Sequence, residues 1–415
     1  MRILALLSTF FVAFLVGCTP KEEKQELKSG IWRATLARDS QKLPFLFEVK
    51  ENSDQKTYTV VVLNGEEHLT MDTTFFEGDS LHLPMRLFDS EIVAYLENDK
   101  LIGKYNRIEN DKIIAYLPFE AEFDKNYKFF EEGKAISEKQ VQGTWSTVFS
   151  YPDSDKQIPA VGTFSQTGSA VSGSFLTPSG DYRYLTGSVN GDSLYLSNFD
   201  GSNAMLFKAV FQADGTLKGE MWTGVKGYRT WVASLDQNAK LPDTEKITFL
   251  KTGFDKIDFS FADLDGSQVS LKDEKFKDKV VILQIMGSWC PTCMDETNYL
   301  APWYDKNKDR GVEIIGLSFE TSDDPERSFP KIEKMKKRLK INYPVLLAGM
   351  NTEASASAAL PMLNKVIYYP TTIFIDRKGK VREIHTGFSG PGTGQYYEEF
   401  ITEFNQLMDN LIAEK

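Results

Sequence analysis

Short runs in which apolar and polar residues alternate fill residues 30–235, and turn-forming residues separate them. Examples are TYTVVVL at 57–63 and SLYLSNF at 193–199. Alternation with a period of two places successive side chains on opposite faces of a strand. The intervening turn signals are Asn64-Gly65, Glu77-Gly78-Asp79, Asn190-Gly191-Asp192 and Asp214-Gly215. The pattern therefore predicts an all-β region.

This β region contains an internal repeat. Two tetrad or triad matches share an offset of 113 residues: Gly30-Ile31-Trp32 with Gly143-Thr144-Trp145, and Gly78-Asp79-Ser80-Leu81 with Gly191-Asp192-Ser193-Leu194. A looser match pairs Lys100-Leu101-Ile102-Gly103 with Thr216-Leu217-Lys218-Gly219. A shared offset at separate places indicates two homologous β units, which we assign to residues 30–142 and 143–235. Two small sandwiches and two halves of one barrel both fit this pattern.

Strands alternate with helices beyond residues 236–247, a polar segment that we interpret as a linker. The predicted elements are a hairpin at 261–271, buried strands at 280–286 and 312–318, a charged helix at 325–340, a strand at 371–375 turned by 376–380 into another strand, and an amphipathic helix at 395–413. The order is strand–helix–strand, an insert, and strand–strand–helix. It predicts an α/β thioredoxin-like domain over residues 248–415.

The first residues have the pattern of an export signal. Arg2 precedes an apolar run from Ile3 to Val16, which is shorter than the roughly 20 residues needed to cross a bilayer. We therefore expect residues 1–17 to be a signal peptide. The tetrad Leu15-Val16-Gly17-Cys18 resembles a bacterial lipobox, which implies lipidation of Cys18 and cleavage before it. An ordinary signal peptide with an incidental cysteine is the alternative.

Residues 18–29 are charged and suit a flexible tether between a lipid anchor and the β region. Within them, Lys21-Glu22-Glu23 resembles the acidic surface-export signals of Bacteroidetes lipoproteins, although plain linker composition explains it equally well. We expect a chain anchored by lipid in the cell envelope, at the periplasmic face of the outer membrane or displayed at the surface.

Charge narrows the range of partners. The formal net charge is −11 and no dense run of Lys and Arg occurs. Phosphate backbones are bound by clustered basic residues, so nucleic acid is not an expected partner.

Cysteine usage points to redox chemistry. Apart from Cys18, the chain contains only Cys290 and Cys293. They stand where a buried strand runs into a helix, and the unpaired N–H groups and positive field of a helix N-terminus stabilise a thiolate. We therefore expect Cys290 to be the nucleophile and Cys293 to resolve the mixed disulfide. Pro291 suits the first helical turn, and Trp289 is expected to pack beside the sulfurs.

Other uses of a C-x-x-C pair fit less well. A zinc site needs about four ligands, and only His68, His82 and His385 are present besides the cysteines. A structural disulfide with so small a loop adds little stability. Copper carriers of the Sco type use C-x-x-x-C. We expect no metal and no cofactor.

Residues 258–390 resemble the TlpA/ResA branch of thioredoxin-like extracytoplasmic disulfide reductases. The resemblance is carried by FADLDGSQVSLKDEKFKDKVVILQIMGSWCPTC, the insert after the strand at 312–318, and YYPTTIFIDRKGKV. It implies that Cys290 and Cys293 form the redox disulfide, that Pro370 is the family's cis-proline, and that Glu296 is the Glu that the family has three residues past the second cysteine. It also implies a substrate groove, which we assign to Trp289, Pro291, Thr292, Tyr369 and Thr371.

The chain departs from the family pattern at two positions. Asn298 stands where the family often has proline, and Gln284 stands where thioredoxins place a buried Asp. A neutral amide cannot take a proton, so Glu296 is the nearer candidate for general acid–base work. Against these roles, Pro370 can be read as an ordinary strand-initiating proline and Glu296 as a solvated charge of the first helical turns.

These features together predict a lipid-anchored protein-disulfide reductase. It would act on disulfide-containing envelope proteins and be kept reduced by a membrane thiol donor, with all redox activity in the C-terminal domain. Oxidase or isomerase activity stays open, since the potential depends on thiolate stabilisation. So do a binding lipoprotein with an accessory thioredoxin domain and a thiol peroxidase.

Overall fold

The computed structural model of the chain describes residues 26–53, 56–241 and 247–414. The predicted signal peptide, the lipobox with Cys18 and most of the predicted tether lie outside the described residues. So does the central part of the predicted linker.

In the described part of the first repeat, nine antiparallel strands form one sheet in the order β2-β1-β9-β8-β7-β6-β5-β3-β4. An additional pairing of β2 with β3 closes this sheet into a barrel, beside which β4 is attached. The strands are β1 Gly30–Arg38, β2 Gln41–Glu51, β3 Thr57–Asn64, β4 Glu67–Thr70, β5 Thr74–Glu77, β6 Ser80–Met85, β7 Ser90–Glu97, β8 Lys100–Glu109 and β9 Lys112–Phe123. A short 3-10 helix, η1 Arg86–Phe88, joins β6 to β7.

The second repeat has the same topology over its described residues. Its sheet order is β11-β10-β18-β17-β16-β15-β14-β12-β13, and β11 pairs with β12 to close it. The strands are β10 Gly143–Ser150, β11 Gln157–Thr167, β12 Ala170–Thr177, β13 Gly180–Asp181, β14 Leu185–Asn190, β15 Ser193–Phe199, β16 Ala204–Phe211, β17 Leu217–Thr223 and β18 Gly227–Leu235. Each repeat is thus a complete barrel, which neither of the two expected arrangements describes.

The matched sequence positions occupy equivalent places in the two barrels. Trp32 and Trp145 are both buried in the first strand of their barrel. The indole of Trp32 donates to the Lys28 carbonyl at 3.0 Å, and that of Trp145 donates to the Val141 carbonyl at 2.7 Å. The predicted internal repeat is therefore confirmed at the level of single hydrogen bonds.

The looser match also has a structural reason. A Cβ atom on Gly103 would lie 2.0 Å from the Val93 carbonyl oxygen, and one on Gly219 would lie 2.4 Å from the Lys208 carbonyl oxygen. Neither β8 nor β17 has room for a side chain where it meets its neighbouring strand. Glycine is therefore required at the same point of both barrels.

Aromatic side chains fill the interior of the second barrel. They are Trp145, Phe149, Phe164, Phe175, Phe207 and Trp231, all buried and in mutual ring contact or in one hydrophobic cluster. This is the alternation seen in the sequence, with the apolar face of every strand turned inward. A ligand inside the barrel would have to displace this core.

The C-terminal domain is built on a mixed sheet with the order β20-β19-β23-β22-β21-β24-β25. The elements are β19 Ser260–Ala262, β20 Gln268–Ser270, β21 Val280–Met286, α1 Pro291–Asn307, β22 Val312–Glu320, α2 Pro325–Leu339, β23 Val345–Met350, α3 Glu353–Ala359, β24 Thr371–Ile375, β25 Val381–Thr386 and α4 Gln395–Ala413, with 3-10 turns η3 Glu274–Phe276, η4 Lys308–Arg310 and η5 Pro391–Thr393. β21, β22 and β23 are parallel, β24 runs antiparallel to β21, and β25 runs antiparallel to β24. This arrangement confirms the predicted thioredoxin-like fold.

The central strand β21 is buried on both faces, as its continuous apolar sequence predicts. Val280, Ile282 and Met286 face the core formed with α1, α2 and α4. Val281, Leu283 and Ile285 face a second core with α3. The sequence did not reveal β23 and α3, because the insert that holds them carries no clear period.

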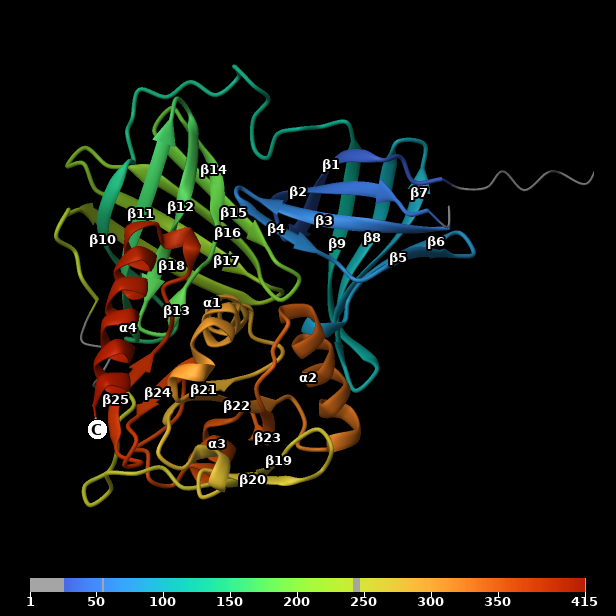
Figure 1. Cartoon of the computed structure of the whole chain (residues 1–415). Helices are drawn as coiled ribbons and strands as arrows, with labels where there is room; N and C mark the ends of the chain where they lie inside the picture. Colours follow the sequence, from blue (N-terminus) through green and yellow to red (C-terminus); the bar gives the residue numbers. More distant parts are fainter. Residues whose placement is uncertain (1–25, 54–55, 242–246, 415) are drawn as a thin grey trace, which may run out of the picture.

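The barrels lie side by side against the C-terminal domain (Figure 1), and α1 faces the junction between them. The first barrel contacts α2 through ion pairs of Asp89 with Lys331 at 2.7 Å and Asp72 with Lys334 at 2.6 Å. Next to the second barrel, Ala239 of the predicted linker packs against Tyr396 of α4. The described end of that linker is therefore attached to the redox domain's last helix.

The aromatic core of the second barrel yields a stability prediction. Replacing Phe175 by Ala removes a fully buried ring that contacts five other aromatic side chains. We expect a loss of about 3–5 kcal/mol in the free energy of unfolding of this barrel. Val210→Ala in the same barrel, where the side chain is 47% exposed, is the control and should change little. Equal denaturant midpoints for the two variants would contradict a packed interior.

Candidate redox site

Cys290 and Cys293 form a disulfide at the N-terminus of α1. Cys290 is the N-cap residue, and its Sγ accepts a hydrogen bond from the Cys293 backbone N–H at 3.1 Å. Pro291 follows as the first helical residue, where its missing N–H is not needed. The Cys290 sulfur therefore lies where the partial positive charge of the helix stabilises a thiolate. In this chain the pair is covered: Cys290 is 4% exposed and Cys293 is 0% exposed.

A buried carboxylate holds the loop that leads into the disulfide. Glu320, at the end of β22, accepts hydrogen bonds from the backbone N–H and the hydroxyl of Ser288 at 2.9 and 2.7 Å. Ser318 adds a third bond at 2.6 Å. Glu320 was not among the residues predicted from the sequence. Its signal was an acidic residue directly after a continuous apolar strand, facing the Gly-Ser turn of the neighbouring parallel strand.

Trp289 and the segment before β24 form the other wall of the site. The Trp289 indole donates to the Phe319 carbonyl at 2.8 Å and lies edge-on to Tyr369. The Tyr369–Pro370 peptide bond is cis, and the Tyr369 carbonyl oxygen lies 3.7 Å from Cys290 Sγ. Thr371 is buried, and its hydroxyl donates to the Tyr368 carbonyl at 2.9 Å. Thr371 is also paired with Ile285 and Thr386 in the sheet, so it presents no free surface to a substrate.

Glu296 is buried in a polar cluster beneath the disulfide. Its carboxylate accepts from Gln284 Nε2 and from the Thr372 hydroxyl, each at 2.7 Å. Gln284 Nε2 also lies 3.5 Å from the Cys293 carbonyl oxygen. Burial raises the pKa of Glu296 to about 7, and the two hydrogen bonds oppose this shift. Gln284, which stands where thioredoxins place a buried Asp, and Glu296, the predicted acid–base residue, therefore lie in one cluster.

The second barrel also contacts the redox motif, which the sequence did not predict. A Cβ atom on Gly180 would lie 3.2 Å from the Thr292 methyl group, between the two cysteines. A Cβ on Gly387 would lie 2.8 Å from the Gly180 nitrogen. Gly387 itself donates to the Pro370 carbonyl at 2.9 Å. The turn between β12 and β14 therefore lies against both sides of the groove beside the disulfide.

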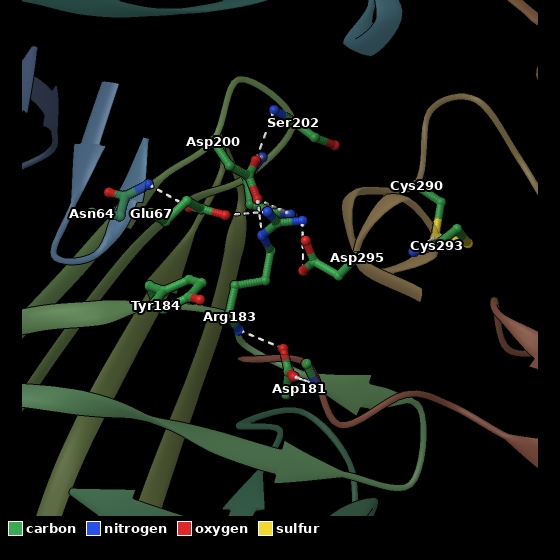
Figure 2. A network of polar contacts seen from close by, with 12 residues as sticks. Asn64, Glu67, Asp181, Arg183, Tyr184, Asp200, Ser202, Cys290, Cys293 and Asp295 are labelled. Atoms are coloured by element: carbon green, nitrogen blue, oxygen red, sulfur yellow. Dashed lines mark hydrogen bonds and ion pairs between the residues drawn. A yellow bond between two sulfur atoms is a disulfide. The ribbon is translucent and has the colours of Figure 1, made fainter. Parts of the chain in front are cut away.

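An arginine at the end of this turn joins the three parts of the molecule (Figure 2). The buried guanidinium of Arg183 contacts Glu67 of the first barrel, Asp200 of the second barrel at 3.7 Å, and Asp295 of α1 at 3.0 Å. Asp295 follows Cys293 by two residues. Burial raises the pKa of Asp295 to about 8, and the positive charge of Arg183 opposes that shift. Each of these residues is an ordinary surface type in the sequence, and only the tertiary structure brings them together.

The remaining polar candidates do not join this site. His385 lies on β25 and packs against Phe400 of α4. His82 contacts Glu91 within the first barrel. Among the residues that the structure describes, no three His, Cys, Asp or Glu side chains are grouped so as to hold a metal ion.

Comparison with known proteins places this geometry in a family. The Redoxin family model matches residues 237–399. The thiol-disulfide oxidoreductase ResA of Bacillus thuringiensis subsp. konkukian is 31% identical over 153 residues, which are 37% of this chain and 78% of that protein. ResA of Geobacillus thermodenitrificans is 31% identical over 144 residues, which are 35% of this chain and 74% of that protein.

Two solved structures are also similar. The thioredoxin domain of a thiol-disulfide oxidoreductase from Bacteroides vulgatus is 26% identical, with a TM-score of 0.28, and the match covers 37% of this chain and 99% of that one. A thiol-disulfide oxidoreductase from Bacteroides fragilis is 18% identical, with a TM-score of 0.27 and coverage of 35% and 99%.

The name of these relatives, thiol-disulfide oxidoreductase, agrees with the C-x-x-C disulfide at the helix N-terminus of this chain. The match covers more than two thirds of the length of each of these two ResA proteins, at 31% identity. The protein therefore belongs to the ResA family of thiol–disulfide oxidoreductases.

Proposed function

We propose that this thiol–disulfide oxidoreductase reduces disulfides of proteins in the cell envelope. The observation that carries the proposal is the position of Cys290 Sγ at the N-cap of α1, where it accepts the Cys293 N–H. A sulfur in this position is a good nucleophile as a thiolate and a good leaving group when it is attacked. The same geometry favours Cys290 as the attacking sulfur, with Cys293 one turn inside the helix.

The reaction balances as two thiol–disulfide exchanges. The reduced Cys290 thiolate attacks one sulfur of a substrate disulfide, forms a mixed disulfide and releases the other substrate sulfur as a thiolate. Cys293 loses its proton and attacks Cys290 Sγ, which releases the second substrate sulfur. The substrate has gained two electrons, and its two thiolates take up the proton lost by Cys293 and one proton from water, while the chain holds the Cys290–Cys293 disulfide. A dithiol donor in the membrane would return the chain to its reduced form.

Glu296 is the proposed acceptor of the Cys293 proton. Its support is a carboxyl group with a pKa of about 7, so that both protonation states are populated near neutral pH. Gln284 lies between this carboxylate and the Cys293 main chain. The amide orients the carboxylate but cannot take a proton itself.

The groove for the substrate chain is proposed to run between the redox motif and the cis-proline. Trp289, Pro291 and Thr292 would form one side, with Tyr369 and Pro370 on the other and the buried Thr371 supporting them from the sheet. An extended substrate segment can pair with exposed main-chain groups beside a cis-proline, while the sulfur of the substrate reaches Cys290.

The location is proposed to be extracytoplasmic, with Cys18 carrying the lipid. None of the helices in the described residues is long and apolar enough to cross a bilayer. The proposed division is a signal peptide at 1–17, a tether at 18–29, the two barrels at 30–142 and 143–235, a linker at 236–247 and the redox domain at 248–415. A role of the barrels in choosing partners is consistent with their filled interiors.

The order of the cysteines can be tested by trapping. Cys293→Ser leaves Cys290 able to attack but removes the resolving thiol, so mixed disulfides with disulfide-containing substrates such as insulin should accumulate. Non-reducing gels and mass spectrometry detect them, and the catalytic reduction of insulin should stop. Cys290→Ser is the matched variant and should trap nothing. Trapping by Cys290→Ser alone would reverse the roles.

The raised pKa of Glu296 gives a pH prediction. The folded protein binds the Glu296 proton more tightly than the unfolded chain, because its pKa is about 7 against 4.5. The stability of the native chain relative to Glu296→Gln should be greatest below pH 4.5 and should fall as the pH rises through 7. The fall can reach roughly 3 kcal/mol. Denaturant unfolding of the oxidised proteins across this range measures it.

Glu399→Gln, on the exposed part of α4, is the control for this experiment and should follow the native curve. In the reduced proteins, Glu296→Gln should also lose one inflection from the pH profile of thiol alkylation. A stability difference that does not vary with pH would contradict the shifted carboxyl, and an unchanged alkylation profile would remove Glu296 from the proton path.

The anchor is tested by Cys18→Ala in the cell that expresses the chain. This variant should leave the membrane fraction and lose metabolic labelling with a fatty acid, whereas native chain keeps both. Persistent labelling of the variant would show that another residue carries the lipid.

A further inference from the structure

The redox pair is less accessible than its chemistry requires. A third sulfur must approach Cys290 Sγ along the direction of the bond that breaks, so thiol–disulfide exchange needs open space at that atom. Cys290 is 4% exposed in the whole chain. Part of the cover comes from its own domain, since the Tyr369 carbonyl lies 3.7 Å from the sulfur.

The second barrel covers the redox motif at Thr292, between the two cysteines. The turn of residues 177–184, which joins β12 to β14, places Gly180 against Thr292 and Gly387 with no space for an additional methyl group on Gly387. The next residue, Asp181, accepts a hydrogen bond from the Gly390 N–H. A Cβ atom on Gly392 would lie 3.1 Å from the Arg183 main chain. The turn is thus in close contact with the loop that follows β25.

Arg183 fixes the position of this turn. Its backbone has a φ of 56°, an uncommon conformation for a non-glycine residue, and its N–H donates to Asp181 Oδ1 at 2.7 Å. The side chain then reaches Asp295 of α1, which stands beside the disulfide (Figure 2). Glu67 of the first barrel contacts the same guanidinium and is itself held by Asn64 at 2.9 Å. One side chain therefore joins the turn to both neighbouring parts.

Two properties of this contact between the turn and the redox domain favour its opening. Cavities of about 230 and 240 Å³ lie on the two sides of Arg183, the first lined by Pro291 and Asp295 and the second by Thr292 and Gly180. A buried ion pair gains little over its hydrated partners, because the desolvation of the charges offsets their attraction. An interface that depends on such pairs and is incompletely filled opens more easily than an apolar core.

We propose that Arg183 is a specificity-determining residue of the oxidoreductase, which holds the turn 177–184 over the redox motif so that Cys290 reacts with small or extended disulfides and is closed to folded protein surfaces. A bulky partner reaches Cys290 only when the Arg183–Asp295 pair breaks and the second barrel moves away from α1. The inference rests on the proposed function in taking Cys290 as the attacking sulfur.

The test compares two thiol reagents on the full chain with Cys18→Ala and Cys293→Ser, in which Cys290 is the remaining thiol. N-ethylmaleimide is the small probe, and a maleimide on a long polyethylene glycol chain is the large probe. The rate with the small probe divided by the rate with the large probe measures access to Cys290, and changes in thiolate reactivity cancel in this ratio. It should exceed the ratio for free cysteine by at least about tenfold, the factor that a barrier of about 1.4 kcal/mol produces.

Two variants open the turn by different means. Asp295→Ala removes the partner of Arg183 on α1, and Gly180→Val adds atoms where the turn meets Thr292 without changing any charge. Both should bring the rate ratio close to that of free cysteine. Asp72→Ala breaks an ion pair of the first barrel with α2, away from the disulfide, and should keep the native ratio. Circular dichroism identifies a variant that has not folded, and the other variant then decides.

A native ratio equal to that of free cysteine would overturn the proposal, and so would an unchanged ratio in the folded variants. The labelling needs no substrate reduction. A chain that labels as expected and reduces no protein disulfide would therefore refute the proposed function and leave the covered site in place.

Discussion

The arrangement of this molecule depends on one constraint, which is that a buried guanidinium must be surrounded by acceptors. Arg183 lies where the two barrels meet the redox domain, and each of the three parts supplies a carboxylate: Glu67, Asp200 and Asp295. Removing any one part would leave a charge in a place that water reaches poorly, which is costly. The cluster therefore determines how the parts are oriented, even if it adds little to the stability of each part.

The same physics acts at the next residue of α1. Glu296 is buried too, and its partners are an amide and a hydroxyl, which carry no charge. Desolvation raises the pKa of its carboxyl to about 7, and it raises that of Asp295 to about 8 even though the charge of Arg183 opposes the shift. Burial therefore outweighs the partners at both positions. The two neighbouring carboxyl groups differ in what they contact: Asp295 pairs with the guanidinium that joins the three parts, and Glu296 bonds to the polar groups beside Cys293.

Much of this could be predicted from the sequence, and the exceptions share a cause. Continuous apolar runs revealed β21 and β22, and the amphipathic period of residues 395–413 gave α4 with its observed bounds. The C-x-x-C pair at a strand–helix junction identified the redox site. Barrel closure, by contrast, depends on the pairing of β2 with β3 and of β11 with β12, which leaves no periodic signal. Glu320 and Arg183 escaped notice because burial, and not residue type, makes them special.

The closure of both barrels has a consequence for how such a chain behaves at high local concentration. A sheet edge offers unpaired N–H and C=O groups to any neighbouring chain. In each barrel the first and last strands pair with each other, as Trp32 with Phe123 and Trp145 with Leu235. Of the described barrel strands, only the short β4 and β13 stand outside the closed rings. Two rounded bodies without ladders to extend can be crowded together on a surface without joining into continuous sheets.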